Sequence, residues 1–120
     1  MEQPASHIRV REVDGVRVVE FADRKILEEL SIQEIGEELA KLVDDTPGIR
    51  LLLCFQNVDH LSTAALGMLI KLNQRIKEQN GQLKLSDINR QIYEVFKITR
   101  LNRLFEIHDT AEEAMASFRR

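Results

Sequence analysis

The segment Ile49–Phe55 (IRLLLCF) restricts the possible folds more than any other part of the chain. It is apolar apart from Arg50 and shows no alternation of polar and apolar residues. A strand with this composition is covered on both faces, as in the centre of a parallel sheet. Helical patterns precede and follow the segment, so we expect a sheet whose parallel neighbours are joined by helices packed against it.

The N-terminal part of the chain predicts a β-hairpin. Two strands, His7–Val13 and Val16–Phe21, are separated only by Asp14-Gly15, a strong signal for a two-residue turn. The next segment, Ala22–Leu30, has apolar residues at helical spacing but begins like a loop, so its structure stays open.

A capping box, Ser31-Ile-Gln-Glu34, predicts the start of the first helix. One apolar stripe then repeats at helical spacing, which indicates a single buried face. Asp44–Gly48 (DDTPG) predicts the end of this helix and a turn. The stripe comprises Ile32, Ile35, Leu39, Leu42 and Val43.

The second half of the chain continues the alternation. We expect a helix from Ser62 or Thr63 to Gln79 that ends at Asn80-Gly81, and four later elements. These are strand Leu83–Leu85, a helix capped by Asn89, strand Glu106–His108 and a helix starting at the capping box Thr110–Glu113. The first of these three helices has the apolar stripe Ala65, Met68, Leu69, Leu72 and Ile76. The helix capped by Asn89 has Ile92, Val95, Phe96 and Ile98, and the last helix has Ala111, Ala114, Met115 and Phe118.

The predicted order is therefore ββαβαβαβα, an α/β fold with a mixed sheet of four to five strands and about four helices. The 120 residues suit one domain, expected over residues 7–118 after a flexible N-terminus of residues 1–6. A single cysteine, Cys54, fits a reducing cytoplasm. The net charge of −3 gives no reason to expect nucleic-acid binding, and no run is long enough to span a membrane.

Two adjacent hydroxyls, Ser62 and Thr63, lie where the second helix is expected to begin. A hydroxyl at this position caps a helix, and the free N–H groups and the helix dipole also tolerate a phosphate there. Ala64 and Ala65 follow, so a partner can approach the backbone closely. The segment is more typical of a protein-binding switch than of a catalytic centre.

The whole pattern resembles the STAS domain of bacterial anti-sigma factor antagonists. The run Ser62-Thr63-Ala64-Ala65-Leu66-Gly67 corresponds to the family motif Asp-Ser-Ser-Gly-Leu-Gly. Gly81–Leu85, Ile98–Phe105 and Asp109–Ala114 are similar to later family segments, so the resemblance extends from His7 to Phe118.

The resemblance implies a regulator without enzymatic activity. In the family, the domain binds an anti-sigma factor that is a Ser/Thr kinase, phosphorylation of the first motif serine abolishes binding, and a phosphatase restores it. Thr63 corresponds to that serine, with Ser62 as a second candidate. The motif aspartate is replaced by Ser62, the second serine by Ala64 and the first glycine by Ala65.

Simpler interpretations remain open. Ser62 and Thr63 could serve only as caps, and the chain could be an unphosphorylated scaffold or interaction module of a signalling or transport assembly. Asp59 and His60 flank the site, but no second base is placed to complete a catalytic set, so we expect them to form a loop surface that a partner touches. The expected partner surface comprises Asp59, His60, Ser62, Thr63, Ala64, Ala65 and Leu66.

Metal and cofactor chemistry have little support in the sequence. His7, His60 and His108 lie far apart, without the spacing of metal ligands. No glycine-rich phosphate loop is present, so we expect no cofactor. Cys54 lies in the apolar run and is expected to be a small buried residue. The sequence does not predict the oligomeric state.

Overall fold

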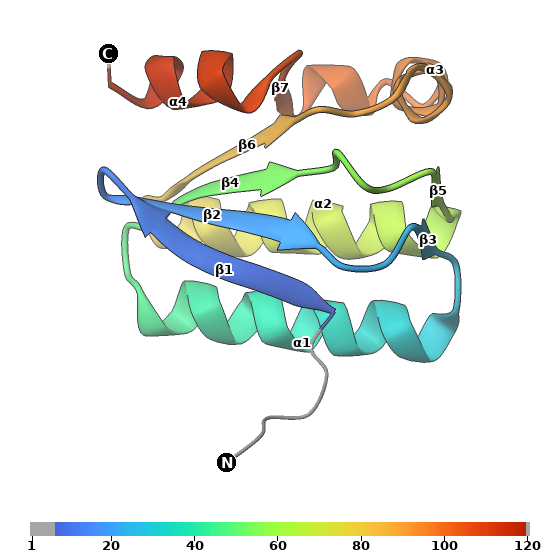
Figure 1. Ribbon diagram of the computed structural model, residues 1–120. Coiled ribbons are helices and arrows are strands. Elements are labelled where there is room, and N and C mark those ends of the chain that lie inside the picture. Colours follow the sequence, from blue (N-terminus) through green and yellow to red (C-terminus); the bar gives the residue numbers. More distant parts are fainter. Residues whose placement is uncertain (1–6, 120) are drawn as a thin grey trace.

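A computed structural model describes residues 7–119 of the chain. The expected flexible segment, residues 1–6, lies outside the described residues. A five-stranded mixed sheet forms the centre, with α1 (Glu29–Asp45) and α2 (Thr63–Glu78) on one face and α4 (Ala111–Phe118) on the other (Figure 1). The expected α/β fold is confirmed.

The sheet has the strand order β1-β2-β4-β6-β7. Its strands are β1 (Ile8–Val13), β2 (Val16–Phe21), β4 (Arg50–Cys54), β6 (Gln82–Ser86) and β7 (Glu106–His108). β1 and β2 are antiparallel, with Val13 opposite Val16, and every other pair in this sheet is parallel. Asp14 and Gly15 both have positive φ angles, 52° and 81°, as the expected two-residue hairpin turn requires.

Two apolar cores lie on the two faces of the sheet. The larger one, under α1 and α2, includes Leu51 and Leu53, and the smaller one, under α4, includes Leu52 and Cys54. Successive residues of β4 thus point to opposite cores, and all four are buried. This explains why the sequence of this strand lacks alternation.

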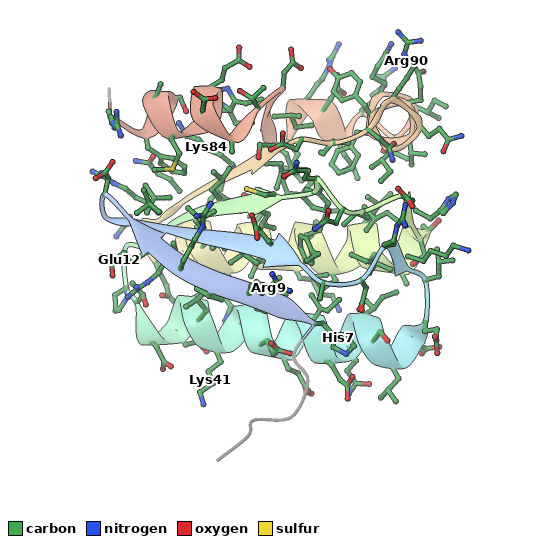
Figure 2. The ribbon with its side chains drawn as sticks, in the orientation of Figure 1. His7, Arg9, Glu12, Lys41, Lys84 and Arg90 are labelled. Carbon is green, nitrogen blue, oxygen red and sulfur yellow. The ribbon has the colours of Figure 1, made fainter. Side chains whose placement is uncertain are left out.

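Lys84 is an exception to the apolar lining under α4. Its side chain points from β6 toward α4 (Figure 2) and is buried. The Nζ atom lies 3.1 Å from Oε2 of Glu106 and 4.4 Å from the ring centroid of Phe118. It also donates a hydrogen bond to Oγ of Ser117, so a charged group joins β6, β7 and α4.

Two short strands were not expected. β3 (Lys25–Ile26) and β5 (His60–Leu61) form a separate parallel pair beyond the main sheet. β3 lies in the segment whose pattern the sequence left open. Its one buried side chain, Ile26, joins the larger core, and Lys25 is exposed.

The predicted start of the first helix is wrong. α1 begins at Glu29, with Glu28 in the N-cap position and no side-chain cap, so the Ser31–Glu34 box lies inside the helix. β3 ends at Ile26, and the chain turns into the helix within two residues. Tertiary placement of β3 and of buried Ile32 therefore overrides the local capping signal.

The end of α2 confirms the expected C-cap and shows why Gly81 is needed. Asn80 takes the left-handed conformation (φ 62°), and Gly81 N–H donates to the carbonyl of Ile76, as in a Schellman motif. A Cβ atom at Gly81 would lie 2.6 Å from the carbonyl oxygen of Ile49. Glycine thus lets the helix end close against the start of β4.

The helix α3 (Arg90–Ile98) lies beyond the carboxyl end of β6 and continues into a 3-10 turn at Leu101–Arg103 (Figure 1). Only Ile92 and Phe96 of its predicted stripe are buried; Val95 is exposed, and 79% of Ile98 is exposed. Within residues 7–119, no helix is long and apolar enough to cross a membrane.

Candidate functional site

The candidate site lies at one end of the molecule, where β3, β5 and the first turn of α2 meet (Figure 1). The chain leaves β4, passes through residues 55–59 and enters β5. Phe55 and Val58 are buried within this loop, so its backbone is held against the core. The exposed residues between them, Gln56 and Asn57, face solvent.

Asn89 holds this loop in place. Its Nδ2 lies 3.2 Å from the carbonyl oxygens of both Val58 and Asp59, to which it donates hydrogen bonds. Its Oδ1 accepts from the N–H of Ile92 at 2.8 Å and caps α3, as the sequence predicts. One side chain therefore ties α3 to the loop before α2.

Arg24, which precedes β3, and Ile26 of β3 hold the loop from its other side. The carbonyl of Arg24 accepts from the N–H groups of Asp59 and His60, and the carbonyl of Ile26 accepts from the N–H of Ser62. The Arg24 guanidinium also pairs with the Asp59 carboxylate at 3.0 Å. Because the side chains of Arg24 and Asp59 are 76% and 46% exposed, the pair contributes little to stability.

The two hydroxyls at the start of α2 have different roles. Ser62 is the N-cap residue, and its Oγ accepts from the N–H of Ala65 at 3.2 Å. Thr63 is the first helical residue and is exposed. Within the described chain, no hydrogen bond from the Thr63 hydroxyl is found, so the cap is supplied by Ser62 and Thr63 faces solvent.

The structure narrows the expected partner surface. His60, Thr63 and Ala64 are exposed, and Asp59 and Ser62 are half-buried. Ala65 and Leu66 are buried in the core, at 0% and 4% exposure. Their side chains do not face a partner, so the surface we carry forward excludes them.

Two grooves adjoin this surface. One, of about 200 Å³, lies between β5 and α3. Its walls comprise Leu27, Asp59, His60, Leu61, Gln91, Ile92 and Val95. The sequence did not predict this groove, because Leu27 lies in the uninterpreted segment and Val95 was assigned to a core stripe.

The second groove, of about 490 Å³, runs between α1 and α2. Ala64, next to Thr63, forms part of its wall near the start of α2. The three basic residues on α2 do not share one role: Lys71 and Arg75 line this groove, whereas Lys77 does not. Arg75 pairs with Asp44 of α1 through two hydrogen bonds of 2.7 and 2.8 Å.

Other groups with possible chemistry lie apart from the site. His7 contacts Asp23 and Glu34, and His108 contacts Glu106. Across residues 7–119, no group of three or more histidine, cysteine, aspartate or glutamate side chains is arranged to hold a metal ion.

Cys54 is buried, as expected. Burial raises the pKa of its thiol above the ordinary value. A thiol that stays protonated is a poor nucleophile, so the environment of Cys54 favours a structural role.

Comparison with known proteins agrees with this architecture. An anti-sigma-B factor antagonist of Bacillus subtilis is 27% identical over 78 residues, which is 65% of this chain and 70% of the relative. A protein named putative anti-sigma factor antagonist BtrV, from Bordetella bronchiseptica, is 24% identical over 94 residues, 78% of this chain and 80% of the relative.

Solved structures share the fold. An anti-sigma-factor antagonist (STAS) domain protein from Planctomyces limnophilus superimposes with a TM-score of 0.83 at 20% identity, covering 95% of this chain and 98% of that one. The profile of the STAS domain family matches residues 7–114, nearly the whole described chain. This chain belongs to the STAS domain family.

Proposed function

We propose that this protein is an anti-sigma factor antagonist that acts by partner switching. In this proposal the unmodified protein binds an anti-sigma factor with Ser/Thr kinase activity and so releases a sigma factor. The kinase phosphorylates Thr63 and ends the binding, and a phosphatase reverses the modification. The names of the similar proteins from Bacillus subtilis and Bordetella bronchiseptica support the class of partner.

The observation that carries the switch is the exposure of Thr63 at the first position of α2. Because Ser62 supplies the cap, the Thr63 hydroxyl can be modified without loss of a hydrogen bond that holds the helix. Thr63 is therefore the preferred acceptor, and Ser62 the second choice. The other surface residues, Asp59, His60 and Ala64, would contact the partner around the acceptor.

A phosphate on Thr63 would act on binding rather than on folding. It adds about −1.5 to −2 charges at neutral pH. The amino end of α2 favours negative charge by roughly 0.3–1 kcal/mol, so the folded domain tolerates the group. At a docked interface the dianion must lose water, and a penalty of about 3 kcal/mol would weaken binding about a hundredfold.

The test combines the purified protein with the anti-sigma factor of the same organism and ATP. Mass spectrometry of the peptide spanning residues 57–71 should locate the phosphate on Thr63, and Thr63→Ala should abolish it. Calorimetry should show strong binding of the unmodified protein and about hundredfold weaker binding of the phosphorylated form. Equal affinity of the two forms would refute the switch.

The second candidate is an interaction module that binds a partner without phosphorylation. The absence of an acidic residue at position 62 favours it, because the family motif places an aspartate there. This candidate predicts that the protein binds a partner while prolonged incubation with kinase leaves residues 57–71 unmodified. In either case we infer a cytoplasmic protein that binds neither nucleic acid nor cofactor and catalyses no reaction.

A further inference from the structure

The groove between α1 and α2 contains a glycine that the fold does not require. Four of the five glycines have a local reason: two have positive φ angles, and two lie where a Cβ atom would press on a neighbour. These four are Gly15 and Gly48, at φ 81° and 74°, and Gly36 and Gly81, with atoms at 3.1 and 2.6 Å from an added Cβ. For Gly67, inside α2, no atom lies within 4 Å of an added Cβ apart from its chain neighbours and the nearby backbone of its own helix.

Glycine in the middle of a helix is unfavourable relative to alanine because it loses more conformational freedom on folding. At Gly67 no close contact within the domain offsets this loss. The missing side chain would project into the α1–α2 groove, which Gly67 lines. Glycine therefore keeps the groove open at the expense of helix stability.

The rims of the groove carry opposite charges. Glu29 and Glu37 lie on the α1 side, and both are exposed. Lys71 lies on the α2 side, exposed and without an ion pair among the described residues. Arg75 on the same side is already neutralised by Asp44. The free charges are thus acidic along α1 and basic along α2.

The floor between these rims is built from small and apolar side chains. They come from three successive turns of α2 and from the facing turns of α1, and they comprise Ile32, Gly36, Ala40, Ala64, Gly67, Met68 and Leu72. From Ala64 to Arg75 the groove follows α2 for about 16 Å. An apolar channel of this length between two helices suits one further helix of about three turns.

We infer that the α1–α2 groove is the docking seat for an amphipathic helix of the anti-sigma factor. This helix carries basic residues along the edge facing Glu29 and Glu37, and acidic residues along the edge facing Lys71. The inference rests on the proposed function and specifies which surface and which partner chemistry serve it. Since Ala64 lines the groove and follows Thr63, a phosphate on Thr63 would lie at the amino end of the seat.

The decisive variants fill the groove without disturbing the fold. Gly67→Ala should raise the thermal midpoint by about 4 °C, because alanine favours the helix. Gly67→Leu should weaken binding of the purified anti-sigma factor about tenfold to hundredfold, as expected for an overfilled interface. Lys77→Leu is the matched control, since it adds the same side chain to the same helix outside the groove, and its affinity should equal that of the wild type.

Charge reversal tests the chemistry of the partner. Lys71→Glu and Glu37→Lys should each weaken binding several-fold, with a larger effect at low salt. Lys41→Glu is the matched control on α1, because Lys41 is exposed and does not line the groove. Stronger binding by Lys71→Glu would show that the docked helix does not carry acidic residues along the edge facing Lys71, and this would overturn the inference.

The outcomes separate this inference from the proposed function. If the wild type binds the anti-sigma factor and Gly67→Leu binds equally well, the groove is not the seat, and the switch at Thr63 stands. If Gly67→Ala stabilises the protein and Gly67→Leu loses affinity, the inference holds. If the wild type binds no anti-sigma factor, both the function and the inference fail.

Discussion

The Nδ2 atom of Asn89 donates a hydrogen bond of 3.2 Å to the carbonyl oxygen of Val58, while the Oδ1 atom of the same side chain caps α3. The loop that presents the candidate site is therefore fixed by a residue from a helix about thirty positions later in the chain. The backbone of this loop is thus held by a side chain from another element, not only by its own residues.

Asn89→Asp and Asn89→Ala should separate the two roles of this side chain. Aspartate keeps an oxygen for the cap but cannot donate to the loop, so it should retain most of the α3 capping energy. Alanine loses both roles and should lower the free energy of unfolding by about 1–3 kcal/mol in total. Urea unfolding measures both variants, and equal losses for the two would show that the cap contributes nothing.

Ser62→Ala should destabilise the protein more than Thr63→Ala does. Loss of the Ser62 cap should cost about 1 kcal/mol. Thr63 is exposed, so its replacement should change stability by less than about 0.5 kcal/mol. Chemical denaturation of the two variants tests this difference, and a larger loss for Thr63→Ala would mean that the two hydroxyls have been assigned the wrong roles.

His7 should make the stability depend on pH. Figure 2 shows His7 where β1 begins, next to α1. The ring is hydrogen-bonded to Glu34 at 2.8 Å and to Asp23 at 2.6 Å, and these contacts raise the pKa of His7 above 6.5. The contribution of protonated His7 to the free energy of unfolding is fully present below about pH 6.5. It is lost as the pH rises through the higher pKa of the folded state.

The measurement compares unfolding free energies of the wild type and His7→Gln between about pH 5.5 and 8.5. The wild type should exceed His7→Gln in unfolding free energy most at the acidic end. The two free energies should converge as the pH rises. A wild-type advantage that grows toward alkaline pH would contradict the assignment of a charged His7 between the two carboxylates.

Gly81→Ala should destabilise the protein by roughly 1–3 kcal/mol, because the added Cβ would meet the backbone oxygen of Ile49 at 2.6 Å. A backbone atom cannot rotate away as a flexible side chain can. Calorimetric melting of the variant checks the loss. Gly15→Asn provides the comparison, since asparagine tolerates the left-handed conformation of that turn, and it should cost less than Gly81→Ala.

Lys84→Met should be nearly neutral or stabilising, whereas Lys84→Ala should be strongly destabilising. Methionine fills the space under α4 and removes the cost of burying a charge. Alanine leaves a cavity beside Phe118, for which about 2–4 kcal/mol is expected. Denaturant titration measures the unfolding free energy of both variants. A large loss of unfolding free energy in Lys84→Met would mean that the ion pair between Lys84 and Glu106 stabilises the fold.

Much of the fold could be predicted because its signals are local. The Asp14-Gly15 turn and the caps at Asn89 and Thr110 each depend on residues a few positions apart, and the structure confirms them. The capping box at Ser31 failed although it is equally local, since the placement of β3 moved the start of α1 earlier. A local signal is reliable only where tertiary packing does not compete with it.

The candidate site could be predicted only in part. Ser62 and Thr63 were placed correctly because a helix start has a sequence signature. The sequence did not show that Leu66 is buried, or that Val95 and Ile98 are exposed. An apolar stripe shows which residues share one face of a helix, but it does not show how much of that face is covered by neighbouring elements. β3 and β5 were missed because two residues carry no periodicity.

The order of strands in the main sheet places β1 and β7 at its margins. β7 has three residues, and β1 carries Arg9, Arg11 and Glu12, all exposed. A strand of another molecule that extended the sheet at β1 would have to pack against this row of charges. The charged edge strand β1 thus disfavours the addition of a strand from another molecule to this mixed sheet.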